Sequence, residues 1–224
     1  SRNVTSLEHA RLWAYLLRTV LRFGLSAADA LTSRRSCRAI YALCTLSYIK
    51  NFLRDQDVAA IAPSSSFLVR RVCKWIDFAE DQVVVEYGPG NGVFSEYILD
   101  RMTPGSTLLL IESNPDFVEM LKGMTASDPR ALVVEDRAER IVEILDAHGI
   151  DEVNYIVSGI PFSFLDAKTK HDLLTRTRDV LADEGKFLVY QNYNHLERPL
   201  REHFSEVTKE YEPRNIPPTM FAYE

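Results

Sequence analysis

The 224-residue chain lacks the features that define several protein classes. No window approaches 18 uncharged apolar residues, so the sequence predicts no transmembrane span. The three cysteines are odd in number and show no CxxC spacing, which argues against a disulfide framework or a zinc ribbon. The five histidines are scattered without the spacing of metal ligands, so we expect no metal site.

Low-complexity linkers and internal repeats are also missing, and the composition is that of a folded protein. Hydrophobic residues make up 46% and charged residues 26%, close to globular averages, which excludes a disordered or fibrous chain. The sequence starts at Ser1 without a visible secretory signal, and we expect a reducing, cytoplasmic location.

Positive charge is concentrated near the N-terminus. Residues 1–75 carry twelve Lys and Arg against four Asp and Glu, a net charge of +8. The remaining residues carry 14 against 28, a net charge of −14, which gives −6 for the chain. A basic N-terminal segment followed by an acidic remainder predicts an anionic partner for the N-terminal segment. On charge alone, this partner could be anionic lipid or nucleic acid.

Helical periodicity dominates residues 1–76, with helices expected at 4–23, at 35–53 and from Ser64–Ser66 to about residue 76. We interpret residues 1–76 as a basic helical N-terminal extension that contacts a membrane and covers the substrate. The first helix combines an apolar side with basic residues and fits an interfacial helix. Its expected membrane contacts are Arg11, Trp13, Arg18 and Arg22. The alternative is a helix that simply caps the domain.

After residue 76 short β-branched runs alternate with helical stretches. Strands are expected at 83–87, 107–112, 131–135, 153–158 and 186–191, with a closing pair at 204–211 and 219–223. The intervening helices are expected at 93–102, 115–124, 138–148 and 167–182. This rhythm predicts an α/β fold of the Rossmann-like type, in which residues 77–224 form a doubly wound, mostly parallel sheet.

A glycine-rich loop follows the first expected strand and reads Glu86-Tyr87-Gly88-Pro89-Gly90-Asn91-Gly92. Its spacing is G-x-G-x-G rather than the dinucleotide pattern G-x-G-x-x-G, and no Walker lysine follows. The carboxylate of Glu86 would repel phosphates but suits a ligand with an ammonium or sulfonium charge. The simplest alternative is a plain turn.

Two further acids end the next two strands. Glu112 can accept hydrogen bonds from the hydroxyls of a ribose, and Asp136 can accept one from an adenine amino group. Singly, Glu112 could be a solvated strand end and Asp136 a helix cap. In this order and after successive strands, the three acids predict an S-adenosylmethionine site.

These motifs resemble class I S-adenosylmethionine-dependent methyltransferases over about residues 80–224. The resemblance implies that Gly88 and Gly90 line the methionine end of the cofactor. It also implies that Glu112 holds the ribose, that Asp136 reaches the adenine, and that Glu86 supports the loop or binds the methionine ammonium group. Ser158 is a further expected cofactor contact.

The fourth strand ends in Ser158-Gly159-Ile160-Pro161-Phe162. This resembles the N-L-P-Y or D-P-P-Y motif of adenine N6-methyltransferases, including ribosomal RNA dimethyladenosine transferases. In those enzymes a polar side chain accepts from the amino group and the aromatic residue stacks on the flipped base. Here Gly159 stands at the polar position, so the aromatic residue is kept and the polar acceptor is lost.

A second resemblance, to bacterial phospholipid N-methyltransferases, extends upstream. Residues 52–54 read FLR and residues 60–65 read AIAPSS, followed by the glycine loop and the Ser-Gly-Ile-Pro turn. It implies methylation of phosphatidylethanolamine towards phosphatidylcholine by a peripherally membrane-associated enzyme. The implied catalytic residues are Ser158, Tyr190 and Tyr193, and the implied substrate contacts are Pro63, Ser64, Pro161 and Phe162.

We therefore predict an S-adenosylmethionine-dependent N-methyltransferase acting on a phospholipid amine at an anionic membrane surface. The alternatives are an RNA adenine N6-methyltransferase, an N-methyltransferase of another lipid or small-molecule amine, and a cofactor-binding scaffold without catalytic activity.

Overall fold

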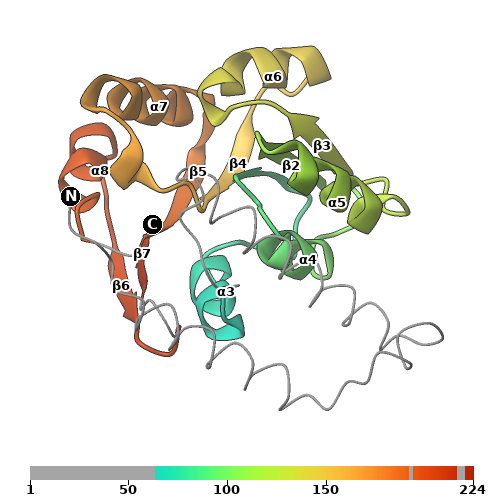
Figure 1. Cartoon of the computed structure of the whole chain (residues 1–224), viewed down its shortest axis with the longest axis horizontal. Helices are drawn as coiled ribbons and strands as arrows, with labels where there is room; N and C mark the ends of the chain where they lie inside the picture. The colour runs from blue at the N-terminus through green and yellow to red at the C-terminus, as the bar shows by residue number, and fades with distance from the viewer. Residues whose placement is uncertain (1–63, 192–193, 216–219) are drawn as a thin grey trace, which may run out of the picture. The chain divides into compact units, whose positions relative to one another are not determined.

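The structure, a computed structural model, describes residues 64–191, 194–215 and 220–224. These residues belong to one compact unit, Ala62–Glu224. Its centre is a seven-stranded sheet in the order β3-β2-β1-β4-β5-β7-β6 (Figure 1). The strands are β1 (Val83–Tyr87), β2 (Thr107–Glu112), β3 (Ala131–Glu135), β4 (Val153–Ser158), β5 (Leu181–Gln191), β6 (Lys209–Glu212) and β7 (Met220–Tyr223).

Strands β1 to β5 pair in parallel, and β7 pairs antiparallel with both β5 and β6. The strand order reverses direction between β1 and β4, which makes their carboxyl ends the topological switch point. This confirms the predicted doubly wound, mostly parallel α/β fold.

Helices cover both faces of the sheet (Figure 1). One core packs α3 (Ser66–Cys73), α4 (Val93–Leu99) and α5 (Pro115–Thr125) on one face. The other core packs α6 (Ile141–His148), α7 (Ala167–Val180) and α8 (Glu197–His203) on the opposite face. Two 3-10 turns, η2 (Ala138–Arg140) and η3 (Phe162–Phe164), follow β3 and β4.

Helix α3 belongs to the sheet domain. The Ser65 side chain caps it by accepting a hydrogen bond from the Leu68 N–H at 3.2 Å. Leu68, Val72 and Cys73 are at most 1% exposed in the first core. Helix α3, which we grouped with the N-terminal extension, thus packs in the core of the sheet domain.

The observed bounds of β1 to β4 coincide with the expected ones, whereas those of later elements differ. Strand β5 begins at Leu181 rather than at residue 186, and α7 accordingly ends at Val180. Val153 of β4 pairs with Leu181 of β5, and Tyr155 pairs with Lys186. The register between the two strands therefore shifts, and residues 182–185 of β5 have no regular pairing with β4. Strand β6 spans Lys209–Glu212 rather than 204–211, because Phe204 and Val207 pack on the second core.

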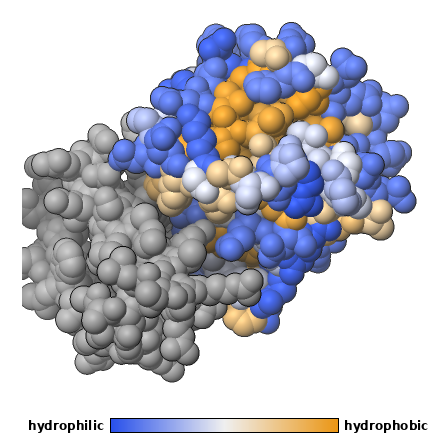
Figure 2. Space-filling view, turned by 90° about the vertical axis from the view of Figure 1, so that its right-hand side faces the viewer, coloured by the Kyte–Doolittle hydropathy of each residue, from blue (hydrophilic) through white to orange (hydrophobic). Residues whose placement is uncertain are grey.

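Strand β3 is one edge of the sheet, and its residues Ala131–Val134 are only partly buried. Figure 2 views this side of the molecule and shows a hydrophobic area on it. Within the described ranges no helix is long and apolar enough to cross a membrane. In the same part of the chain no group of three His, Cys, Asp or Glu is arranged to hold a metal ion.

Candidate cofactor and acceptor site

The glycine loop turns sharply at the end of β1. Gly88, Gly90 and Gly92 have φ angles of 64°, 55° and 75°, a region that favours glycine. A Cβ atom added at Gly90 would meet no atom within 4 Å, so the loop backbone borders open space there. A Cβ at Gly92 would instead lie 2.9 Å from the Met124 sulfur, so this glycine is required for the packing of α4 on α5.

The Glu86 carboxyl group is buried beneath this loop, with 1% of the residue exposed. Its Oε2 accepts a hydrogen bond from the Ser95 hydroxyl at 2.6 Å, whereas its Oε1 has no partner. Burial raises the pKa of Glu86 to about 8, the Ser95 hydrogen bond opposes the rise, and the nearby Glu112 carboxylate adds to it. A buried, unsatisfied carboxyl oxygen is costly unless a ligand satisfies it.

The Glu112 carboxylate ends β2 and faces the glycine loop. It accepts from the Gly90 N–H at 3.1 Å and from the Asn114 N–H at 2.9 Å, one bond on each oxygen. Burial raises its pKa, and these backbone hydrogen bonds lower it. Each oxygen keeps a second lone pair, so the carboxylate can also accept hydrogen bonds from two hydroxyl groups.

Asp136 follows β3 and lies beside the end of β2, because its N–H donates to the Glu112 carbonyl at 3.1 Å. Its carboxylate accepts from the Arg137 N–H at 2.8 Å and pairs with Arg140 at 2.9 Å. The side chain therefore binds Arg137 and Arg140 at the two ends of the 3-10 turn η2, and its contact with an adenine remains a prediction.

The three acids lie on successive strand ends, and their surroundings fit S-adenosylmethionine. The free Oε1 of Glu86 suits an ammonium group, the space beside Gly90 admits a ligand, and Glu112 offers acceptors to a ribose. Ser95 and Asn114 were missed from the sequence. Asn114 precedes a proline in a typical helix-capping position, a signal that could have been used.

The turn after β4 lies directly against the glycine loop. The Gly159 N–H donates to the Tyr87 carbonyl at 3.2 Å, and a Cβ at Gly88 would lie 3.4 Å from the Ile160 side chain. Ser158 is fully buried, and its hydroxyl accepts the Ile160 N–H at 3.3 Å. The Ser158 side chain thus stabilises the turn, which places Gly159 beside the loop.

The Tyr190 hydroxyl lies over Gly159. A Cβ at position 159 would overlap the hydroxyl oxygen, so this residue has to be glycine as long as Tyr190 keeps its position. The Tyr190 ring stacks on Phe94 with centroids 4.6 Å apart and an interplanar angle of 10°. The stack, together with the antiparallel pairing of Tyr190 with Ala222, fixes the hydroxyl at the switch point.

Phe162 does not face this site, contrary to our expectation of a substrate-stacking aromatic residue. It is fully buried in the second core, edge-on to Phe187 at 6.3 Å. Gln191 holds its backbone in place, since the Phe162 N–H donates to the Gln191 Oε1 at 3.2 Å and the Gln191 Nε2 donates to the Ile160 carbonyl at 2.7 Å. The exposed aromatic residue of this turn is Phe164, which is 64% exposed.

The remaining predicted site residues divide into two groups. Pro161 and Ser64 are half-buried, the first at the start of η3 and the second just before the N-cap of α3. Other predicted residues lie outside the described part of the chain, namely Pro63, Tyr193, Arg11, Trp13, Arg18 and Arg22.

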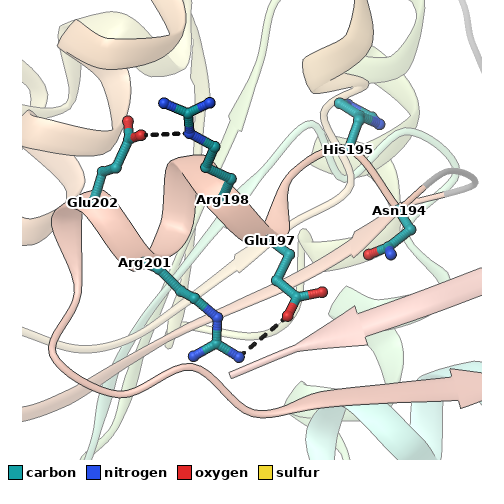
Figure 3. Close-up of a pocket in the computed structure, with 6 residues that line it drawn as sticks. All are labelled: Asn194, His195, Glu197, Arg198, Arg201 and Glu202. Carbon is teal, nitrogen blue, oxygen red and sulfur yellow. Dashed lines mark hydrogen bonds and ion pairs between the residues drawn. The ribbon is translucent and has the colours of Figure 1, made fainter.

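A pocket of about 420 Å³ lies at the start of α8, and no residue of the glycine loop lines it (Figure 3). Its charged side chains pair with one another along the helix: Arg198 with Glu202 at 2.9 Å and Arg201 with Glu197 at 3.2 Å. Pairs four residues apart are typical of a solvated helix face, so this pocket is not part of the candidate site.

Comparisons with known proteins show which proteins this chain is similar to. The family described as ribosomal RNA adenine dimethylase matches residues 44–138. The ornithine lipid N-methyltransferase of Singulisphaera acidiphila is 34% identical over 176 residues, 75% of this chain and 88% of that protein. The ribosomal RNA small subunit methyltransferase A of Mycoplasma capricolum is 25% identical over 155 residues, 66% of this chain and 52% of that protein.

Among solved structures, Aeropyrum pernix fibrillarin, crystallised with natively bound S-adenosyl-L-methionine, has a similar fold. The TM-score is 0.56 at 11% identity, with 70% of this chain and 72% of fibrillarin covered.

Proposed function

The chain belongs to the class I S-adenosylmethionine-dependent methyltransferases, in the same family as the ornithine lipid N-methyltransferase, and we propose that it methylates the amine of a lipid headgroup. The N-methyltransferase activity and the cofactor follow from the family. The lipid acceptor and the roles of individual residues are the proposed part.

The observation that carries the proposal is the position of the Tyr190 hydroxyl over Gly159. The adenine enzymes have a polar side chain at position 159 of this turn, which accepts from the planar amino group. Here that space contains a phenol oxygen from the neighbouring strand, stacked in place by Phe94. A single hydroxyl can accept a hydrogen bond from a flexible aliphatic amine.

When bound, S-adenosylmethionine supplies an electrophilic methyl group on a sulfonium sulfur. Glu86 accepts a hydrogen bond from the methionine ammonium group, Glu112 binds the ribose hydroxyls, and Asp136 accepts from the adenine. Tyr190 accepts a hydrogen bond from the incoming amine and so orients its lone pair, while the buried Ser158 keeps the turn in position. The proton that the amine loses passes to water, and the work of the protein is positioning and exclusion of solvent.

The acceptor carries a primary aliphatic amine. Ornithine, named in the lipid of the relative from S. acidiphila, ends its side chain in such an amine, as does the ethanolamine of phosphatidylethanolamine. Because this relative covers most of the chain, we favour an ornithine-containing lipid over phosphatidylethanolamine. The N-terminal residues Arg11, Trp13, Arg18 and Arg22 remain the proposed membrane contacts.

An RNA adenine is the second candidate acceptor. The match to the ribosomal RNA adenine dimethylase family and the likeness to the M. capricolum enzyme favour it. Against it stand the missing polar side chain at Gly159 and the full burial of Phe162, the residue that would stack on a flipped base.

The proposal is tested with the full chain and vesicles that contain either an ornithine lipid or phosphatidylethanolamine in a phosphatidylcholine background. We expect methylated ornithine lipid. Tyr190→Phe should lower kcat about tenfold, the effect of one lost oriented hydrogen bond, without weakening S-adenosylhomocysteine binding. Tyr211→Phe is the matched control, because that tyrosine is 48% exposed on β6. Failure to methylate any lipid amine would refute the proposed acceptor.

A further inference from the structure

A second pocket, of about 390 Å³, lies between α3 and the end of β6. Its lining is Phe67, Arg70, Arg71, Lys74, Glu212 and Arg214, which we call the basic pocket. The lining holds four cations and one carboxylate, and a second carboxylate, Glu210, pairs with Arg71 and with Lys74, both at 2.5 Å. Four positive charges against two negative ones leave the pocket basic, although the sheet domain as a whole is acidic. The pocket takes no part in the cofactor and acceptor site described above.

The charges of the basic pocket are layered. The Glu212 side chain is fully buried, whereas the side chains of Lys74 and Arg214 are 45% and 56% exposed. Hydrogen bonding from Arg214 lowers the pKa of Glu212 to about 2, so this carboxylate stays ionised and holds its cations. Glu212 therefore lies at the base, Glu210 pairs with Lys74 and Arg71 beside it, and Arg70 and Arg214 are the cations on the solvent side that do not pair with Glu210.

The guanidinium groups are held in place before any ligand arrives. Arg214 donates from Nε to Glu212 at 2.8 Å, and Arg71 donates to the same carboxylate at 2.8 Å. Phe67, 40% exposed, lies between two arginines, with the Cζ of Arg214 4.3 Å and that of Arg70 5.4 Å from its ring centroid. Arg70 is exposed, and its Nη2 donates to the Ser66 hydroxyl at 3.2 Å. It forms no ion pair with any described carboxylate, so its charge can still attract an anion.

The basic pocket and the acceptor turn both lie towards the carboxyl ends of the parallel strands. Tyr190 pairs with Ala222, and Ala222 pairs with Glu210, so Tyr190 and Glu210 are two strand spacings apart, about 10 Å. Glu212 lies two residues further along β6, towards the carboxyl ends of the parallel strands. The Ser65 N–H donates to the buried Asn215 side chain at 2.8 Å, which ties the start of α3 to this edge.

We propose that the basic pocket binds the anionic group, phosphate or carboxylate, of a lipid headgroup, two strands away from Tyr190. Arginine matches both groups by paired N–H donors, and the exposed Phe67 adds an apolar contact at the lipid interface. This inference rests on the proposed lipid acceptor. It adds that the lipid is recognised through its anion, by residues two strands away from the methyl transfer.

The test compares the full-length wild type with Arg70→Gln, Arg214→Gln and the double variant. Arg70→Gln is the cleanest change, since it breaks no described ion pair. Arg214→Lys keeps the charge and removes the fork of donors. Arg198→Gln is the control, because this arginine is equally charged and 90% exposed on the opposite face of the sheet. Thermal unfolding identifies any variant that has lost stability.

In the first arm, the lipid amine is presented in neutral detergent micelles. We expect the KM for lipid to rise about tenfold per removed guanidinium, with kcat and S-adenosylhomocysteine binding unchanged. Arg214→Lys should recover part of the loss, and inorganic phosphate should inhibit the wild type more than the double variant. A KM effect here identifies the anion of the substrate headgroup as the ligand.

In the second arm, flotation is measured with phosphatidylglycerol vesicles that contain no amine lipid. Loss of flotation in the double variant, with an unchanged micellar KM, identifies surrounding anionic lipids as the ligand. Unchanged KM and unchanged flotation together would overturn the basic pocket as an anion site. The flotation arm needs no methyl transfer, so it is independent of the proposed activity. If the wild type methylates lipid and the variants behave identically, only the inference about the pocket fails.

Discussion

Cofactor binding should release a proton from Glu86. Its carboxyl group is buried, has one oxygen without a partner, and has a pKa raised to about 8 by burial. At pH 7 the ligand-free protein therefore holds this group mainly as the neutral acid. An ammonium group placed at Oε1 would favour the carboxylate, and the proton would leave.

The Glu86→Gln substitution shows how much of the pH dependence of stability comes from the proton on Glu86. The folded pKa lies above the ordinary value of 4.5, so the folded protein keeps a proton that the unfolded chain loses. The stabilising contribution of Glu86 is then complete below about pH 4.5 and is lost as the pH rises towards 8. Each tenfold difference in proton affinity corresponds to about 1.4 kcal/mol, so the loss approaches roughly 4–5 kcal/mol. The glutamine of the variant cannot ionise, so the variant should not show this loss.

The assay is urea unfolding followed by circular dichroism at several pH values between 5 and 8. The free energy of unfolding of the wild type should fall relative to that of Glu86→Gln across this range. Glu135→Gln is the matched control, since Glu135 is exposed at the end of β3 and the same substitution there changes no buried carboxyl group.

Calorimetry with S-adenosylhomocysteine at pH 7, in two buffers of different ionisation enthalpy, measures the released proton directly. We expect close to one proton for the wild type and none for Glu86→Gln, with an affinity loss of roughly 1.5–3 kcal/mol. Parallel pH profiles of unfolding, or equal proton release by both proteins, would refute the reasoning.

Three other substitutions or deletions test separate parts of the molecule. Glu112→Ala should weaken S-adenosylhomocysteine binding by roughly 2–4 kcal/mol in calorimetry, because two charge-assisted hydrogen bonds are lost; an unchanged Kd would remove Glu112 from the site. Gly90→Val should abolish binding, since its side chain would fill the open space beside the loop and valine strains the backbone at a φ of 55°; the result counts only with a native circular dichroism spectrum, and normal binding would mean that the loop is only a turn. Deleting residues 1–24 should reduce flotation with phosphatidylglycerol vesicles and spare cofactor binding, because each basic residue near an anionic surface contributes about 1 kcal/mol; flotation equal to that of the parent would place the membrane contact elsewhere.

The first four strands could be predicted to the residue because their signal is local. Runs such as Val83–Val85 are apolar and β-branched, and turn residues bound them, so burial and propensity agree. Strand β5 could not be predicted in full. Its first half contains Asp183, Glu184 and Gly185, which read as a turn, and only the irregular pairing with β4 keeps this stretch extended.

The placement of the three acids at one end of the sheet was predictable for the same reason. Glu86, Glu112 and Asp136 each follow from a strand end, and parallel strands bring such ends to one edge. The partners Ser95 and Asn114 come from the following helices, and their contacts depend on how those helices pack.

The acceptor half depends on contacts between distant residues. Sequence alone marks Gly159 as the loss of a polar side chain, and the structure shows that the space belongs to Tyr190, 31 positions away. Phe162 carries the right residue type for stacking, but the 3-10 turn η3 directs it into the core. Strand register determines the position of Tyr190, and turn geometry determines the burial of Phe162. Neither can be recognised from the neighbouring residues in the sequence.

The most direct test of the central claim follows a labelled methyl group from S-adenosylmethionine to its acceptor. The full chain is incubated with methyl-deuterated cofactor, vesicles containing an ornithine lipid, and small-subunit ribosomal RNA in the same reaction, and both fractions are analysed by mass spectrometry. We predict label on the lipid amine and none on the RNA. Label on RNA adenine with unlabelled lipid would contradict the account, because the Tyr190 hydroxyl over Gly159 would then not determine the acceptor.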